Sequence, residues 1–204
     1  MTIRHSILAA VAAAACLPAA QAQDTGNWLV RGRALYLDSD NKDNTGLDLS
    51  INNKTFPEVD ISYFFNPNLA AELILTYPQK QRLHSSVVGA QIGTFKHLPP
   101  TLTLQYHVTG LTGFRPYVGA GLNYTNLSSV HFNSNVDALK LGVKHNSVGW
   151  AVQAGVDVPL GGGWLVNADL KKVQIDTTVY SAGQSVGKFK VDPVLASIGI
   201  GKRF

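Results

Sequence analysis

The chain has 204 residues, of which 45% are hydrophobic and 15% are charged, and its formal net charge at pH 7 is +4. The charged fraction is below the roughly 25% that is usual in soluble domains, yet no apolar run reaches the ~20 residues of a membrane-spanning helix. These numbers exclude a helical membrane protein, and the apolar content excludes a disordered chain. The small positive charge does not indicate nucleic-acid binding, so no nucleic-acid partner is expected.

Residues 1–22 are predicted to be a signal peptide. A basic start precedes an alanine-rich apolar stretch, and Ala20 and Ala22 fit the small-residue pattern of a signal peptidase site. A second interpretation is lipoprotein processing at Cys16, although the apolar stretch before it is short. Cleavage after Ala22 leaves one domain, residues 23–204, without cysteine. Disulfides and thiolate metal sites are therefore excluded from that domain.

Eight segments in which apolar residues alternate with polar or small residues follow the signal peptide. This period of two is typical of β-strands. In chain order the predicted strands cover residues 28–37, 56–65, 69–77, 101–108, 117–126, 148–158, 164–177 and 189–204. In the sixth strand every even position is apolar, and the odd positions are small or polar.

The connections between these strands alternate in length. Those at 66–68, 109–116 and 159–163 are short and contain Asn, Pro or Gly, whereas those around 38–55, 78–100, 127–147 and 178–188 are long. Outer-membrane barrels combine short periplasmic turns and long extracellular loops with strands of about 9–11 residues. The predicted fold class is therefore all-β, an eight-stranded antiparallel transmembrane β-barrel that is located in the cell outer membrane.

Such a barrel must close, because each backbone N–H and C=O group inside lipid needs a partner. Aromatic residues on the face predicted to meet lipid would form the interfacial girdles. These are Trp28, Tyr36, Tyr63, Tyr77, Tyr106, Tyr124, Trp150, Trp164 and Phe204. The alternative is a soluble lipocalin-like barrel, which buries its apolar face inward. The pattern of short and long connections favours the membrane barrel.

Several runs resemble the OmpW family of Gram-negative outer-membrane proteins, which includes the alkane-uptake protein AlkL. The runs are KHLPPTL at 96–102, FRPYVGAGLNYT at 114–125, QAGVD at 153–157 and IDTT at 175–178. The chain end, with Phe204 last, is similar to the terminal signal read by the barrel assembly machinery, although Lys202 replaces a usual aromatic residue. The resemblance implies passive uptake of small hydrophobic molecules.

Strand parity assigns each inward residue a height in the lumen. Polar residues gather toward the periplasm, and they are predicted to form a plug: Arg31, Arg33, Asp60, Glu72, Asp157, Asp169 and Lys171, together with Gln105 and Asn167. Apolar residues gather toward the exterior, and they are predicted to form a vestibule: Leu35, Leu37, Phe56, Ile74, Val173, Ile175, Val191 and Leu195. Charges in so narrow a lumen are expected to pair with one another.

These two layers suggest that a small hydrophobic solute enters the vestibule and leaves sideways into the bilayer above the plug. A second interpretation is that the apolar side chains only fill the barrel. The alternative function is a non-conducting surface barrel that acts as a receptor, adhesin or envelope-stabilising protein. The expected partners are outer-membrane lipid and lipopolysaccharide, the solute, and the barrel assembly machinery through Phe204.

Other candidate sites are weaker. Ser62 or Ser197 could face His107 in the lumen, but the sequence provides no residue to orient a base, so an enzyme is not expected. The histidines lack metal-ligand spacing, and no metal or cofactor is expected. Basic residues in the long connections either contact lipopolysaccharide phosphates or are simply solvated. They are Lys80, Arg82, Lys96, Lys140, Lys144, Lys188 and Lys190.

Overall fold

The alternating segments of the sequence form long antiparallel strands in the computed structural model, which describes residues 26–204. The predicted signal peptide and its alternative cleavage site at Cys16 lie outside the described residues. Eight strands form the wall of a barrel. They are β1 (Trp28–Asp38), β4 (Lys54–Phe64), β5 (Leu69–Leu75), β8 (Thr101–His107), β9 (Arg115–Phe132), β11 (Asn146–Gly161), β12 (Trp164–Val173) and β15 (Val194–Arg203).

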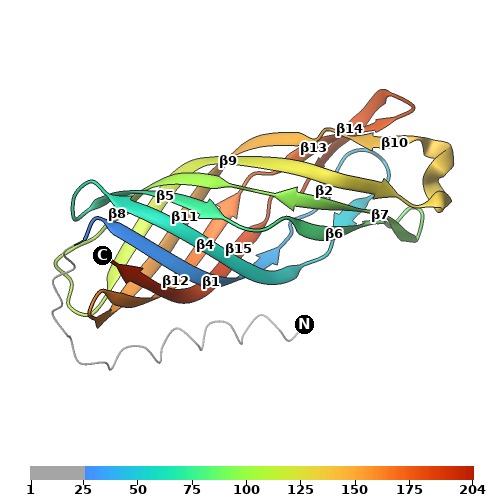
Figure 1. The fold of residues 1–204 in the computed structure, drawn as a ribbon. Coiled ribbons are helices and arrows are strands. Elements are labelled where there is room, and N and C mark those ends of the chain that lie inside the picture. The colour runs from blue at the N-terminus through green and yellow to red at the C-terminus, as the bar shows by residue number, and fades with distance from the viewer. Residues whose placement is uncertain (1–25) are drawn as a thin grey trace.

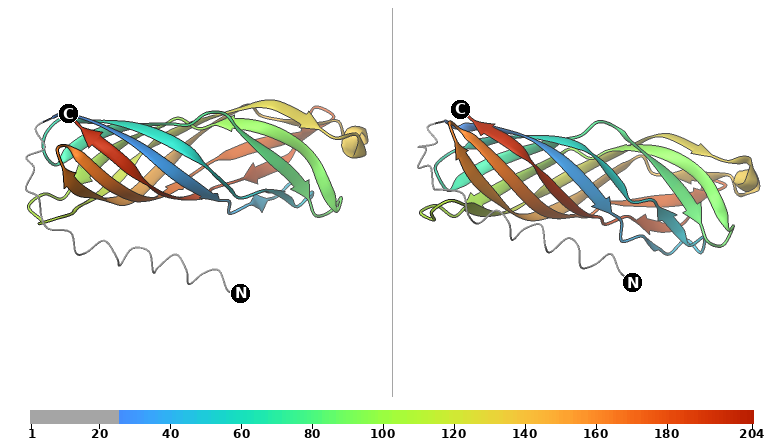
Figure 2. Two further views of the ribbon diagram at one scale, coloured as in Figure 1. Left: turned by 60° about the horizontal axis from the view of Figure 1, so that its bottom comes forward. Right: turned by 90° about the horizontal axis from the view of Figure 1, so that it is seen from below.

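The barrel is closed, as predicted. Pairing runs in the order β1, β4, β5, β8, β9, β11, β12, β15 and returns to β1, and each pair is antiparallel. The backbone of Phe204 exchanges two hydrogen bonds with that of Trp28, at 2.9 and 3.0 Å, so the last residue of the chain is joined to the first residue of β1. Closure satisfies the backbone groups that lipid cannot satisfy. The strands are tilted around a long cylinder (Figures 1 and 2).

Side chains on the barrel strands alternate between lumen and exterior. In β1, Arg31, Arg33 and Leu35 are buried, whereas Trp28 and Tyr36 are exposed at 48% and 41%. In β11, Trp150 and Val152 are likewise exposed. An apolar exterior around a polar lumen is the arrangement of a membrane barrel, and it excludes the lipocalin-like alternative. Among residues 26–204, no helix is long and apolar enough to cross a membrane.

The two ends of the barrel differ. The turns at 65–68, 108–114 and 162–163 are short and lie at the end that also holds the carboxyl terminus (Figure 1). At the other end the wall continues well beyond the aromatic girdle as an extracellular extension. Its elements are β2 (Lys42–Asp43), β3 (Leu49–Ile51), β6 (Gln79–Ser85), β7 (Ala90–Leu98), the short helix η2 (Ser134–Leu139), β10 (Leu141–Val143), β13 (Asp176–Ser181) and β14 (Gln184–Lys190).

The extension corrects the strand boundaries predicted from sequence. The long connections exist, but much of their length is β-structure: β6 and β7 occupy most of 79–98, and β9 continues to Phe132. The predicted strand 164–177 is divided into β12 and β13, and the predicted strand 189–204 into the end of β14 and β15. Tertiary pairing decides these ends, because β3, β10 and β2 are too short to be recognised from periodicity alone.

Candidate functional site

A network of buried ion pairs crosses the lower lumen, and Arg31 on β1 lies at its centre. Arg31 Nη1 lies 2.9 Å from Asp60 Oδ1 on the neighbouring strand β4, and Nη2 lies 2.8 Å from Asp157 Oδ2 on β11. The side chains of Arg31 and Asp60 are fully buried. Arg31 also donates a hydrogen bond of 3.1 Å to Ser62. A planar guanidinium suits this role because it donates in several fixed directions at once.

Arg33 extends the network one level higher. Its Nε lies 2.9 Å from Glu58 Oε1, and its Nη2 lies 2.8 Å from Asp60 Oδ2 and 3.2 Å from Glu72 Oε1. Lys171 Nζ lies 3.6 Å from Glu58 Oε2 and 3.9 Å from Asp169 Oδ1. The seven residues predicted for the plug therefore lie together, joined by Glu58. We call Arg31, Arg33, Glu58, Asp60, Glu72, Asp157, Asp169 and Lys171 the ionic layer.

Neutral polar side chains on β8, β9 and β11 complete the ionic layer. Gln153 on β11 donates to Glu72 Oε2 at 2.7 Å, and Thr103 donates to the same oxygen at 3.1 Å. Tyr117 donates to Asp169 at 2.9 Å. Gly155 makes room for that ring, since a Cβ at this position would lie 2.4 Å from the Tyr117 side chain. The lumen at this height is thus filled by hydrogen-bonded side chains.

A small cavity lies directly above the ionic layer. Glu58 and Lys171 form part of its floor, and apolar side chains form most of its wall. Seven of the eight predicted vestibule residues line it: Leu35, Leu37, Phe56, Ile74, Val173, Ile175 and Leu195. Its free volume is about 20 Å³. We call this space the lower cavity.

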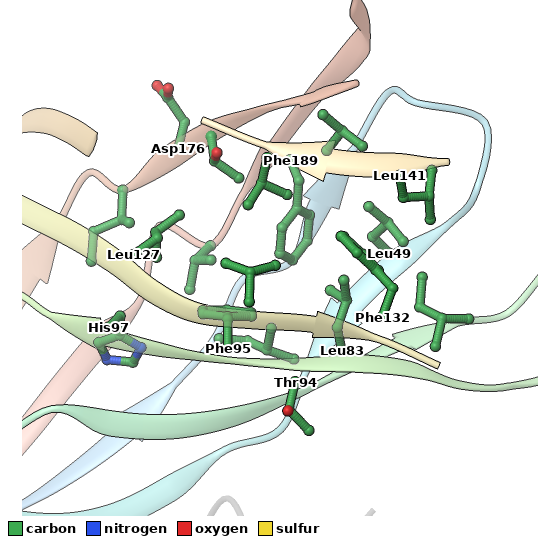
Figure 3. A pocket seen from close by; sticks show the side chains of 18 of the residues that line it. Leu49, Leu83, Thr94, Phe95, His97, Leu127, Phe132, Leu141, Asp176 and Phe189 are labelled. Atoms are coloured by element: carbon green, nitrogen blue, oxygen red, sulfur yellow. The ribbon is translucent and has the colours of Figure 1, made fainter. Parts of the chain in front are cut away.

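A larger and more apolar cavity, the upper cavity, lies inside the extracellular extension (Figure 3). Phe95 from β7 and Phe189 from β14 enter it from opposite walls, while Thr94 and Asp176 lie at its rim. Only three vestibule residues line it, namely Leu37, Ile175 and Val191. The other apolar lining residues are Leu47, Leu49, Ile51, Leu83, Ile92, Phe95, Leu127, Val130, Phe132, Leu141, Val143, Val179 and Phe189. Its free volume, about 40 Å³, is twice that of the lower cavity.

His97 connects the two cavities, because it lines both of them together with Leu37 and Ile175. It lies on β7 above the aromatic girdle, opposite Gln79 and Leu127. Burial, and then the nearby Lys54 ammonium, lower the pKa of the imidazole to about 4. Its Nε2 has no hydrogen-bond partner among residues 26–204. A neutral imidazole therefore lies at the junction at pH 7.

The hydrogen-bonded ladder of the wall is interrupted beside the lower cavity. Pairing between β4 and β5 ends where Val59 lies opposite Leu75, and in the same register it resumes only where Ile51 lies opposite Leu83. Residues 52–58 and 76–82 face each other across this opening without backbone pairing. Pro57 and Pro78 contribute, since proline has no N–H to donate to a ladder. Phe56, Glu58 and Thr76 line both the opening and the lower cavity.

Sequence reasoning missed most of the upper cavity, because its residues were assigned to loops. In 79–85 the buried residues Gln79, Gln81, Leu83 and Ser85 alternate with the basic residues Lys80, Arg82 and His84, and this period of two could have predicted a strand. For the same reason His84, His97 and His131, which fall in the predicted long connections 78–100 and 127–147, lie on strands in the structure. Glu58 and Tyr117 had the inward parity of their strands, but the predicted plug did not include them.

The candidate serine and histidine residues do not form a catalytic pair in this geometry. Ser62 accepts its hydrogen bond from Arg31. His107 contacts Gln105 Oε1 at 2.9 Å and stacks on Tyr117 with ring centroids 4.8 Å apart. Within residues 26–204, no hydrogen bond joins His107 to Ser62 or Ser197, and no group of three or more His, Cys, Asp or Glu residues is placed to hold a metal ion.

Comparison with known proteins assigns the family. The OmpW family model matches residues 25–204. The chain belongs to the OmpW family. It is 38% identical to an uncharacterized outer-membrane protein of Sinorhizobium fredii, over 87% of this chain and 80% of the relative. It is 32% identical to outer membrane protein W of Vibrio cholerae, over 97% of both chains. These relatives support location in the outer membrane.

One relative and one solved structure bear on function and fold. The chain is 30% identical to the dibenzothiophene metabolism operon protein PahQ of Pseudomonas aeruginosa, over 83% of this chain and 80% of the relative. The crystal structure of outer membrane protein OprG from Pseudomonas aeruginosa superimposes with a TM-score of 0.75 at 28% identity, covering 88% of this chain and 96% of that chain. The barrel of this chain is thus the family barrel.

Proposed function

We propose that this OmpW-family barrel is a channel for passive uptake of small hydrophobic molecules. The solute enters the upper cavity from outside, passes His97 into the lower cavity, and leaves sideways into the bilayer. The observation that carries the proposal is the stacking of two apolar cavities on a closed ionic layer. An apolar molecule gains roughly 25 cal/mol per Å² on leaving water, and it gains nothing by entering a layer of paired charges.

The interruption between 52–58 and 76–82 supports a sideways exit. It adjoins the lower cavity, so a solute there needs no passage through the ionic layer. Two side-chain hydrogen bonds cross the interruption, from Arg82 N–H to Asn52 Oδ1 at 2.9 Å and from Lys54 Nζ to the Lys80 carbonyl oxygen at 3.3 Å, but no row of backbone hydrogen bonds has to break before the two strands separate. The dibenzothiophene operon name of PahQ supports the solute class, since dibenzothiophene is an apolar aromatic compound.

Uptake by proteoliposomes tests the proposal. Ile74 lines the lower cavity and is 2% exposed, so Ile74→Lys places a charge in the path, and uptake of linear alkyl compounds should fall by at least about tenfold. Val87→Lys is the matched control because Val87 is 66% exposed in the turn after β6, and it should retain uptake. Uptake of a homologous alkyl series should rise with chain length if an apolar binding step is present.

The alternative function gives a distinct result. A non-conducting surface barrel would give the same background permeation in empty liposomes, in wild-type proteoliposomes and in Ile74→Lys proteoliposomes. Wild-type uptake in the Ile74→Lys variant would also contradict the proposed path. Dependence on size alone, without dependence on alkyl length, would indicate a porin-like pore rather than an apolar cavity.

A further inference from the structure

The outer wall carries a basic patch immediately above the membrane-facing belt, on β6 and β7. Lys80 and Lys96 are exposed and lie directly opposite each other in the antiparallel register. Arg82 is exposed on the same face of β6, two residues beyond Lys80. Cβ atoms of directly opposite residues are about 4.5–5.5 Å apart, and like charges in this position destabilise a sheet. We call Lys80, Arg82 and Lys96 the basic patch.

Lys54 adds a fourth cation from the adjoining strand. Its Nζ lies 3.3 Å from the backbone carbonyl oxygen of Lys80, across the opening in the ladder. Among residues 26–204, no carboxylate forms an ion pair with any of these four cations. The local repulsion is therefore not neutralised by the protein itself.

Lysines elsewhere on the extracellular side, by contrast, lie near carboxylates. Lys42 Nζ lies 2.8 Å from Asp40 Oδ2, and Lys172 Nζ lies 3.6 Å from the same oxygen. The Lys42 ammonium holds the pKa of the Asp40 carboxyl below its usual value. Lys190 lies opposite Asp176 in the sheet register. Lys42 and Lys172 thus share a carboxylate, whereas no carboxylate forms an ion pair with the basic patch in the part of the chain that the structure describes.

The position of the basic patch identifies its partner. Tyr77, 55% exposed, belongs to the upper aromatic girdle, and Lys80 follows it by three residues. An extended chain rises about 3.3 Å per residue and the strands are tilted, so Lys80 lies less than about 10 Å above Tyr77. Aromatic girdles lie at the headgroup level, and the patch therefore lies near the phosphates just outside the acyl chains of the outer leaflet. We infer that Lys80, Arg82 and Lys96 bind the phosphate groups of lipopolysaccharide from the outer leaflet.

Each part of the patch contributes to recognition of a phosphorylated lipid. Lysines act as point charges for phosphate, and Arg82 adds a planar fork for two phosphate oxygens. A bound phosphate also removes the repulsion between Lys80 and Lys96. Lys80 and Arg82 border the opening between 52–58 and 76–82, but lipid A binding and solute uptake are measured separately, so either proposal can fail without the other.

Binding of diphosphoryl lipid A to the detergent-solubilised full-length mature protein tests the inference, with native mass spectrometry as the readout. Lys80→Gln/Lys96→Gln should weaken binding by about tenfold or more, since each basic residue near an anionic lipid contributes appreciably to affinity. Lys140→Gln/Lys188→Gln removes the same charge from exposed lysines elsewhere and should leave binding unchanged. Lys80→Arg/Lys96→Arg should retain binding.

Several outcomes would overturn the inference. Equal losses in the two glutamine variants would show attraction by net charge rather than by this patch, and no loss in Lys80→Gln/Lys96→Gln would remove the patch from binding. Displacement of lipid A by millimolar inorganic phosphate would indicate a general anion site. Heat-modifiable migration in gel electrophoresis verifies that each variant is folded, so a loss of binding cannot be attributed to failure to fold.

Discussion

The lower and upper halves of the lumen are filled by opposite kinds of side chain, and they tolerate change differently. In the ionic layer, each charge depends on particular partners at 2.8–3.9 Å, such as Arg31 with Asp157 or Lys171 with Asp169. In the upper cavity, apolar side chains from six or more separate segments meet without directional bonds. The lower half therefore tolerates only side chains that keep the same ion pairs and hydrogen bonds, whereas the upper half tolerates any apolar side chain of similar volume.

The largest expected effect is in the ionic layer. Arg31→Met removes the cation shared by Asp60 and Asp157, so that Asp60 keeps only Arg33 and the buried Asp157 loses its ion pair with Arg31. Breaking a buried ion pair typically costs about 3–5 kcal/mol, and the free energy of unfolding in lipid should fall by that amount. Lys42→Gln, which breaks an exposed ion pair, should produce no measurable change. Equal effects of the two substitutions would show that the ionic layer is not the more demanding region.

A smaller effect is expected in the upper cavity. Phe189 is 2% exposed, and Phe189→Ala should lower the free energy of unfolding by about 3 kcal/mol through lost packing. Phe189→Leu should cost less than about 1.5 kcal/mol, because apolar replacements of similar size are usually tolerated. Denaturant unfolding of both variants measures the difference. A loss in Phe189→Leu as large as that in Arg31→Met would contradict the contrast between the regions.

Phe189→Ala also tests whether the solute passes through the upper cavity. Phe189→Ala widens the upper cavity, so uptake of branched or cyclic hydrocarbons should increase several-fold relative to linear ones. Phe65→Ala is a useful control, because Phe65 is 58% exposed beside the short turn at the opposite end of the barrel. An unchanged ratio of cyclic to linear uptake in Phe189→Ala would mean that the solute does not pass this ring.

The smallest expected effect is a dependence of stability on pH at the junction between the cavities. The folded-state pKa of His97 is lowered to about 4, whereas the usual value in an unfolded chain is about 6.5. Between these values the unfolded state binds more protons, so the His97 contribution to stability is complete above pH 6.5 and decreases as pH falls toward 4.

His97→Gln should remove this part of the pH dependence. The measurement is the free energy of unfolding at pH 7 and pH 5 in the wild type and the variant. Other titratable groups near the junction are Lys54, Asp176, Glu58 and Lys171, and they are unchanged in the variant. Equal pH dependence in both proteins would show that His97 is not a buried neutral group.

The barrel and its two-layered lumen were predictable because strand parity is a local property. A period of two in segments such as 28–37 places Arg31, Arg33 and Leu35 on one face, whatever the neighbouring strands do. The alternation of short and long connections then fixed which ends of the strands lie together. The predicted closed barrel and outer-membrane location are confirmed by the structure and the family match.

The extracellular extension was not predictable in the same way. Strands β3 and β10 have three residues each, and their pairing with β6 and β13 depends on partners more than 30 residues away. Leu49 and Leu83 therefore looked like loop residues, although both are buried in the upper cavity. The interruption of the ladder was hidden too, because a missing partner is a property of two strands and not of either sequence alone.

The most direct test is the position of a bound solute. Crystals of the protein grown with a brominated alkane locate the bromine by anomalous scattering. The account predicts bromine in the upper cavity between Phe95 and Phe189, or in the lower cavity beside Ile74 and Leu195. Bromine between Arg31 and Glu72, within the ionic layer, would contradict the claim that charge closes the lumen to apolar molecules.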